Sequence, residues 1–499
     1  MGQDAAVATS PDFDELAAAV LSATDSCDHA DLRLVSTRTS FQTRRDRDAR
    51  ADVDGSERSL GVRVLQDGCW GFAATDDLAI PEATAAARQA MELAAATAAT
   101  VDQPVELAAE PTHQGSWRSD FSIDPFEISA AERMEFLQWG CEQLLADARV
   151  QHVDATANAV REETLYADSQ GTHTSQLRVR LQAAFTAVQL DDAGGFTQLS
   201  TLAPPVGQGW EFLTDEQSTW PWANELAELP ELLSAKAAAP SVQPGKYTLV
   251  IHPSNLWLTI HESIAHATEL DRIKGYEANY AGTSFVTPSD IGELQYGSPL
   301  MNVQADRTTP HGLATVAWDD EGVAAQTWPL ISNGILVGMQ LDRAMAAAAG
   351  LPRSNGCAYA DSASHIPLQR MPNITLQPQP EGGSVADLIA GVEDGIYVVG
   401  DDSWSIDMQR YNFQFTGQQF HRIKSGRLVG QLQDVVYQGR TTDFWNSMVA
   451  VGGEETVELG GTLNCGKGQP GQSAPVSHGS PAAVFAEVNV LNSRQESGA

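Results

Sequence analysis

One stretch of the chain reads Pro253-Ser-Asn-Leu-Trp-Leu-Thr-Ile-His-Glu-Ser-Ile-Ala-His-Ala-Thr-Glu-Leu-Asp-Arg-Ile-Lys-Gly275. It predicts a single helix, because a polar residue at Ser254 or Asn255 can cap the start and Gly275 suits the end. One apolar face of this helix is expected to pack into a core, and it carries Leu256, Ile260, Ile264 and Leu270.

The same stretch contains His261, Glu262 and His266. Two imidazoles beside a carboxylate indicate a zinc site, because neutral imidazole binds zinc well and a nearby Glu can deprotonate water. In the common zinc-peptidase pattern the histidines are four residues apart, whereas Ala265 extends the spacing to five here. On an ideal helix this turns the second ring about 140° away from the first, so a metal site requires a π-type bulge. The alternative is two unrelated histidines, one in the core and one at the surface.

A zinc site needs a third ligand, and a Gly-rich loop, Asn464-Cys-Gly-Lys-Gly-Gln-Pro-Gly-Gln, offers Cys465. A thiolate is a strong zinc ligand, and glycines let the backbone approach closely. A lone cysteine is more often a small buried apolar residue, and we keep that interpretation for Cys27, Cys69, Cys141 and Cys357. Spacing leaves several histidines as competing ligands: His252, His311, His365, His421 and His478.

A Pro-punctuated region over residues 203–245 divides the chain. Before it, the patterns predict helices over 13–21, 81–99 and 129–148 and strands over 32–37, 61–65, 150–161, 163–168 and 173–190. After it, a buried strand over 246–251 leads into the histidine-bearing helix, and mostly short strands follow. The fold class that we expect is α+β. An N-terminal region (1–240) has an antiparallel sheet and long helices, a largely β C-terminal domain (241–494) carries the helix, and 495–499 form a tail.

Composition and charge narrow the classes of function. Among 499 residues there are 30 Lys and Arg against 65 Asp and Glu, so the net charge is −35. Such a charge disfavours nucleic acid and anionic membranes as partners. The five cysteines are widely spaced, which does not suit a disulfide framework, and the first residues lack a signal-peptide pattern. We therefore expect a cytoplasmic globular protein.

Several segments of the chain resemble the TldD/PmbA family of "modulator of DNA gyrase" peptidases, and within it the catalytic TldD-like branch. They are Gly61-Val-Arg-Val-Leu, Gly71-Phe-Ala, Asp168-Ser-Gln-Gly-Thr, His261-Glu-Ser-Ile-Ala-His, Arg370-Met-Pro-Asn, Asn412-Phe-Gln-Phe and Asn464-Cys-Gly-Lys-Gly-Gln-Pro. This resemblance implies that His261, His266 and Cys465 bind Zn²⁺ and that Glu262 is the general base.

The chain departs from the family pattern around the second histidine. The family usually has Gly before and after it and then Glu-Gly-Asp, whereas this chain has Ala265, Ala267 and Glu269-Leu-Asp271. The larger side chains are expected to narrow access to the metal. Asp271 keeps the family's acidic residue, and we expect it to be a second-shell partner of a ligand histidine.

The function that these observations predict is zinc-dependent hydrolysis of amide bonds in small or unfolded peptides. The resemblance implies that the peptide binds as an added strand within a dimer, either a homodimer or a heterodimer with a TldE-like subunit. One alternative is the same chemistry recruited to natural-product maturation, which the altered residues around His266 suggest. Another is a non-catalytic, TldE-like peptide-binding subunit, which would have no chemical need for His261, Glu262, His266 and Cys465.

Overall fold

The N-terminal part of the molecule is built on one long sheet. The computed structural model describes residues 11–98, 101, 103–190, 195–214 and 218–496. The sheet has the order β3-β2-β1-β5-β6-β4, with β7 on β6, and all of its pairings are antiparallel except that of β4 with β6. Its strands are β1 (His29–Arg45), β2 (Asp48–Gln66), β3 (Cys69–Thr75), β4 (Gln114–Arg118), β5 (His152–Asp168), β6 (His173–Leu190) and β7 (Phe196–Ser200).

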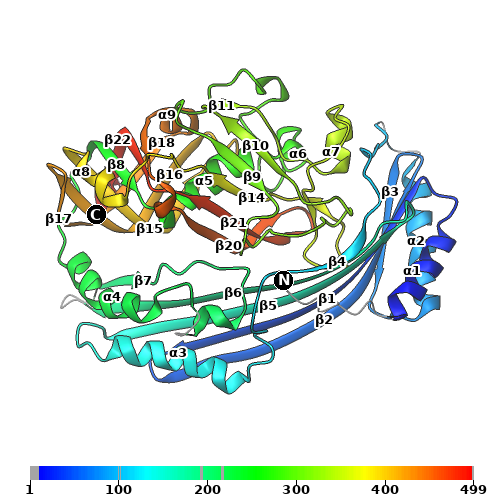
Figure 1. The fold of residues 1–499 in the computed structure, drawn as a ribbon, viewed down its shortest axis with the longest axis horizontal. Coiled ribbons are helices and arrows are strands. Elements are labelled where there is room, and N and C mark those ends of the chain that lie inside the picture. Colours follow the sequence, from blue (N-terminus) through cyan, green and yellow to red (C-terminus); the bar gives the residue numbers. More distant parts are fainter. Residues whose placement is uncertain (1–10, 99–100, 102, 191–194, 215–217, 497–499) are drawn as a thin grey trace.

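Four helices bury apolar side chains against this sheet. They are α1 (Pro11–Ala23), α2 (Ile80–Ala98), α3 (Ala130–Leu145) and α4 (Trp222–Ala237). Figure 1 shows α1 and α2 at one end of the long strands and α3 and α4 toward the other end. Each helix pair has its own core cluster, one around Phe13 and Leu32 and the other around Phe185 and Trp222.

Several N-terminal strands are longer than the sequence patterns predict. The predicted strands over 32–37 and 61–65 are parts of β1 and β2, and those over 150–161 and 163–168 are one strand, β5. Strand β4 was not predicted. The first half of β2 is exposed and polar, so it shows no apolar alternation. Backbone pairing with β1 forms it instead. The predicted helices over 13–21, 81–99 and 129–148 are confirmed as α1, α2 and α3, with residue 99 outside the described residues.

Residues 245–492 form two further sheets. In one, the order is β15-β8-β22-β18-β16-β17, with β19 on β22, and β15 also pairs with β16, which closes a ring of strands. Its strands are β8 (Gly245–Ile251), β15 (Asp394–Ile406), β16 (Asn412–Lys424), β17 (Arg427–Leu432), β18 (Val435–Arg440), β19 (Met448–Val451) and β22 (Ala483–Asn492). The protein is thus α+β.

The other sheet has the order β11-β10-β9-β14-β21-β20, and β12 and β13 form a separate pair. These strands are β9 (Val303–Asp306), β10 (Thr327–Ser332), β11 (Ile335–Leu336), β12 (Ala358–Tyr359), β13 (Leu368–Gln369), β14 (Asn373–Leu376), β20 (Glu458–Lys467) and β21 (Gln472–Ser480). The helices of this half are α5 (Pro253–Ile260), α6 (Leu270–Ile273), α7 (Arg343–Ala348), α8 (Val385–Ala390), α9 (Thr441–Asn446) and α10 (Ser493–Glu496).

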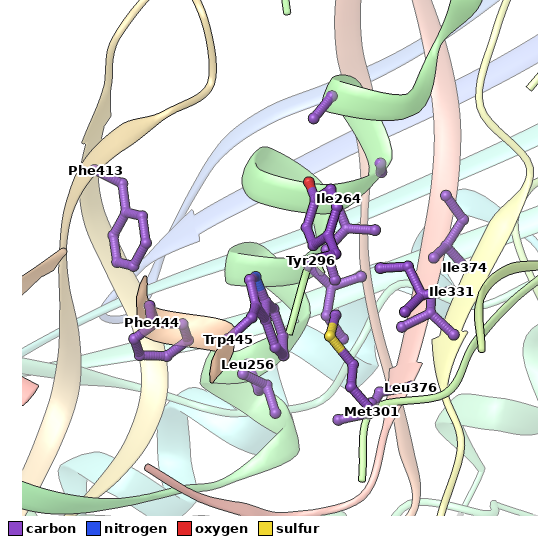
Figure 2. Packing of buried hydrophobic residues seen from close by; sticks show 14 of the residues in the cluster. Leu256, Ile264, Tyr296, Met301, Ile331, Ile374, Leu376, Phe413, Phe444 and Trp445 are labelled. Carbon is purple, nitrogen blue, oxygen red and sulfur yellow. The ribbon is translucent and has the colours of Figure 1, made fainter. Parts of the chain in front are cut away.

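Helix α5 lies between the two C-terminal sheets, and every one of its residues is buried. Figure 2 shows Leu256 and Ile264 packed among side chains from both sheets and from α9, including Ile374, Phe413 and Trp445. A helix that is enclosed on all sides needs apolar residues beyond one face, and Trp257 and Leu258 supply them here. The segment with the two histidines continues directly from α5, so a rigid core positions it.

The two halves of the molecule meet through buried polar contacts. Arg33 of β1 bonds Asp320 at 2.9 Å, Arg63 of β2 bonds Glu321 at 3.1 Å, and the Tyr359 hydroxyl donates to Glu162 of β5 at 3.0 Å. The domain limits at 240 and 494 stay a prediction. In the described residues, no helix is long and apolar enough to cross a membrane.

Candidate metal centre

The histidine-bearing stretch is not the single helix that the sequence predicts. Helix α5 ends at Ile260, a π turn covers His261–Ala265, a 3₁₀ turn covers His266–Thr268, and α6 follows. Glu269 is extended (φ −73°, ψ 119°), because its backbone forms a β-bridge with Gln340. The N-cap is also two or three residues earlier than expected: the ring of His252 accepts a bond from the Ser254 amide.

The π turn accommodates the five-residue spacing between His261 and His266. The backbone N–H of His266 donates to the carbonyl of His261, an i→i+5 bond. This widened turn brings the two rings onto the same side of the segment, with their centroids 4.6 Å apart. The π-type bulge that a metal site requires is therefore confirmed.

The third candidate ligand, Cys465, comes from the other side of the site. The Sγ atom of Cys465 is 3.6 Å from Nε2 of His266, and one ligand atom each from His261, His266 and Cys465 lie within 4.8 Å of one another. Tetrahedral zinc holds a nitrogen and a sulfur ligand about 3.5 Å apart, as the usual bond lengths imply. Two imidazoles and one thiol match the three protein ligands of a catalytic zinc site, in which water takes the fourth position.

Cys465 does not lie in a loop, as the sequence suggested, but near the end of β20. It pairs with Ala474 of β21, and the turn of the hairpin follows at 468–471. A Cβ atom at Gly466 would meet nothing within 4 Å, so close approach does not require this glycine. Gly468 has a φ of +84°, which favours glycine in the turn.

Each histidine is held through its second nitrogen. Nδ1 of His261 bonds Nε2 of His478 on β21 at 2.7 Å, and Nδ1 of His266 bonds Oε2 of Glu269 at 2.9 Å. Nε2 of His266 therefore faces Sγ of Cys465, and the contact with His478 leaves Nε2 of His261 as its candidate ligand atom. Metal-binding histidines are typically oriented through the other ring nitrogen in this way. Among the competing histidines of the sequence, His478 thus contacts a ligand candidate through its ring, whereas His252 caps α5.

Burial sets the protonation states of the three candidate ligands. It lowers the pKa of His261 to about 4 and that of His266 well below the usual value, so both rings are neutral near pH 7. It raises the pKa of the Cys465 thiol, and Arg370 opposes this effect. Neutral imidazoles are ready to bind a metal, whereas the thiol must lose its proton on binding.

Glu269, rather than Asp271, forms the hydrogen bond to a candidate ligand histidine. Glu269 contacts His266, because the extended backbone at Glu269 turns its side chain back toward that ring. Asp271 bonds Nζ of Lys467 at 2.9 Å, and the same ammonium group bonds Oε1 of Glu269 at 2.8 Å. The side chain of Lys467 is fully buried, so it forms a buried ionic link between β20 and the segment after His266.

Glu262 has a partner that sequence reasoning missed. Nη1 of Arg410, in the turn between β15 and β16, donates to Oε2 of Glu262, and Nη2 donates to the Ala281 carbonyl at 3.0 Å. Arg410 has a φ of +62°, an uncommon conformation for a non-glycine residue. Of the sequence motifs, Asn412-Phe-Gln-Phe lies nearest to Arg410 in the chain, but it does not predict a contact with Glu262.

The remaining cysteines lie in other parts of the molecule. Cys69, Cys141 and Cys357 are buried, and Cys27 packs against the cluster around Phe13. All five thiols of the chain are free. The interpretation of these four residues as packing residues therefore fits their surroundings.

Two family models match the chain. Residues 244–492 match the PmbA/TldA metallopeptidase C-terminal domain, and residues 30–94 match PmbA/TldA metallopeptidase domain 1. The C-terminal match contains the π turn, β20 and β21, so it includes the candidate metal centre.

Curated relatives and a solved structure are similar over nearly the whole chain. A metalloprotease of Methanothermobacter thermautotrophicus is 25% identical over 94% of this chain and 97% of its own. A metalloprotease TldD homolog of Haemophilus influenzae is 24% identical over 87% of this chain and 86% of its own. The fold resembles that of TldE from Thermococcus kodakarensis with a TM-score of 0.73 at 15% identity, over 96% of this chain and 99% of that one. The chain therefore belongs to the TldD/PmbA family and is a metallopeptidase.

Proposed function

We propose that this protein is a zinc peptidase that hydrolyses amide bonds of small or unfolded peptides. The observation that supports this proposal most strongly is that one ligand atom each from His261, His266 and Cys465 lie within 4.8 Å of one another. Glu262 directly follows the first of these residues, as a general base for a metal-assisted hydrolysis would.

The residues of the site divide the chemistry among them. His261, His266 and Cys465 would hold the zinc ion, which supplies an activated water and polarises the scissile carbonyl. Glu262 takes a proton from the attacking water and delivers it to the leaving amine as the C–N bond breaks. Arg410 bonds Oε2 of Glu262, and we assign the proton transfer to Oε1.

Neither alternative function has a distinguishing observation in this molecule. The side chains that replace family glycines, Ala265, Ala267 and Leu270, belong to the apolar core rather than to the access route of the metal. They therefore do not support a specialised substrate. A non-catalytic role would not require the three candidate zinc ligands to lie together or Glu262 to lie beside them.

The assembly that we propose is a dimer, either of two copies or with a TldE-like subunit. The whole-chain likeness of the fold to a TldE supports a shared architecture. Mixing this chain with candidate partner subunits and measuring mass in solution distinguishes the two forms.

The test of the proposed function combines metal content and hydrolysis. The purified protein, alone and with a partner subunit, is expected to contain one zinc per chain and to cleave unstructured peptides. Glu262→Gln should keep the zinc and lose at least about 100-fold in kcat. Cys465→Ala should remain folded and lose zinc. Absence of zinc, or full activity of Glu262→Gln, would overturn the proposal.

A further inference from the structure

A second cavity, separate from the metal centre, lies where the two halves of the molecule meet. It has a volume of about 610 Å³, within the range of roughly 300–1,000 Å³ typical of ligand sites. Trp70 and Phe72 of β3 line it from the N-terminal sheet, and Tyr276 and Tyr280 line it from the segment after α6. We call it the interdomain cavity.

Two buried glutamine side chains that line the interdomain cavity have atoms without a hydrogen-bond partner among the described residues. Gln369 of β13 is 1% exposed, and in the described part of the chain neither its Nε2 nor its Oε1 has a hydrogen-bond partner. Oε1 of Gln472 is also unpartnered among those residues, and this side chain is 5% exposed. A buried polar group without a partner costs about 1–3 kcal/mol, so a ligand that pairs with these atoms would recover this free energy. The Gln369 amide offers one donor and one acceptor, which complement a peptide group.

The charge of the interdomain cavity is negative. Four carboxylates line it, against one arginine, Arg63. Arg63 pairs with Glu321, and Lys467 pairs with Asp271, which leaves Glu277 and Asp342 without a cationic partner among the described residues. Burial and then the charge of Glu321 raise the pKa of Asp342 to about 8, so a cation bound beside this carboxyl group would favour its ionised form. A cationic ligand would relieve this imbalance.

The interdomain cavity adjoins the metal centre. Gln472 pairs with Lys467 in the β20–β21 hairpin, and Lys467 is two residues from Cys465, a distance of about 7 Å along a strand. Asn279, near Tyr276 and Tyr280, bonds Gln469 of the hairpin turn at 2.8 Å. The carbonyl of Ala281, two residues later, accepts from Arg410, the partner of Glu262. The β20–β21 hairpin and the segment from Tyr276 to Ala281 therefore connect the interdomain cavity to residues of the candidate metal centre.

We propose that the interdomain cavity is a substrate subsite that binds a peptide segment carrying a basic side chain. Gln369 pairs with a backbone amide of this segment, and its Lys or Arg side chain lies against Asp342 and Glu277. This inference rests on the proposed function and adds a substrate class to it: peptides with a basic residue a short distance from the bond that is cut.

The test measures binding rather than turnover. The zinc-loaded Glu262→Gln protein is titrated into a dye-labelled peptide Ala-Ala-Lys-Ala-Ala, and into its counterpart with norleucine in place of Lys, with fluorescence anisotropy as the readout. The Lys peptide is expected to bind at least about tenfold more tightly. Asp342→Asn, which keeps an acceptor for the Met345 amide, should abolish this preference and leave norleucine-peptide binding unchanged.

Gln369→Met removes the amide at nearly constant volume. It should weaken both peptides about tenfold, and it should raise the melting temperature, because the amide has no partner in the free protein. Gln431→Met is the matched control, because Gln431 is also a buried glutamine with an unpartnered Oε1 but does not line the cavity. It should leave both affinities unchanged.

Three results would overturn the inference: equal binding of the two peptides, unchanged affinities in Gln369→Met, or no binding of either peptide to the parent. Because binding is measured without turnover, these results are independent of whether Glu262→Gln abolishes hydrolysis. Failure of the proposed function is therefore distinguishable from failure of the subsite.

Discussion

At the scale of single residues, the candidate metal centre depends on the groups that hold the ligands. The ring of His478 is completely buried, bonds Nδ1 of His261 and is nearly parallel to the ring of Trp257, with an interplanar angle of 9°. This arrangement occupies Nδ1 of His261, so Nε2 is the nitrogen that we expect to bind the proposed zinc ion. Glu269 does the same for His266.

Replacement of His478 should therefore affect metal binding more than folding. His478→Ala is expected to weaken zinc affinity about 10–100-fold, measured by competition with a chelator, because His261 loses the partner that orients it. His478→Gln, which can still bond Nδ1, should recover part of the loss. His421→Ala is the control, because the His421 ring bonds Gln419 on β16 instead. Equal affinities in the parent and His478→Ala would contradict this role.

The sequence predicts the site residues that are neighbours along the chain. It does not predict those that reach the site from distant parts of the chain only after folding. His261, Glu262 and His266 stand within six consecutive positions, so their chemistry is visible without a structure. Cys465 is 199 positions from His266, and spacing alone did not separate it from the competing histidines. His478 and Arg410 act through contacts between strands and turns, which no local pattern records.

At the scale of elements, strand β20 and the segment after the π turn are joined by charge. Lys467 meets Glu269 and Asp271, and Arg272 also bonds Glu269, at 3.1 Å. Two cations and two carboxylates thus balance inside the core. Burial opposes the ionisation of Glu269, yet Lys467 and Arg272 outweigh it and lower its pKa well below the usual range. The sequence predicted neither this link nor the strand at Cys465 and Lys467, which it assigned to a loop.

Breaking this link should destabilise the protein. Lys467→Met leaves two buried carboxylates with one cation, so the free energy of unfolding is expected to fall by about 3–5 kcal/mol, measured by denaturant titration of metal-free protein. Arg440→Met is the control: it removes a pair with Asp443 in which both side chains are more than half exposed, and should change stability by less than about 1 kcal/mol. Similar losses in the two variants would argue against a special role for the buried link.

At the scale of the whole molecule, ionic contacts connect the N-terminal sheet to the C-terminal half. Glu162 of β5 lies between Arg178 and Arg180 and accepts from the Tyr359 hydroxyl of β12. Burial would raise the pKa of Glu162, but the two arginines outweigh it and lower the pKa to about 2. The sequence predicted an α+β protein correctly, because long helices and alternating strands are local patterns. The polar contacts between its halves had no such signal.

The carboxylate of Glu162 makes the free energy of unfolding depend on pH. Because the pKa of Glu162 is lower in the folded state, its contribution is complete above about pH 4.5 and is lost as the pH falls toward 2. Glu162→Gln should lower stability at pH 6 by about 3 kcal/mol and flatten the loss between pH 4.5 and 2, measured by thermal unfolding. Glu381→Gln, at an exposed position, should follow the parent curve. A parent-like slope in Glu162→Gln would contradict the assignment.

The π turn at His261–Ala265 makes the length of this segment as important as its composition. Each residue of a helix adds about 100° of rotation, so a one-residue deletion or insertion would rotate α5 against Glu269 by that amount. Helix α5 is enclosed by two sheets, and Glu269 is held by His266, Arg272 and Lys467. Neither α5 nor Glu269 can therefore rotate to compensate for the change in length. In evolutionary terms, members that retain the activity should vary at positions 263 to 265 by substitution and never by a gap.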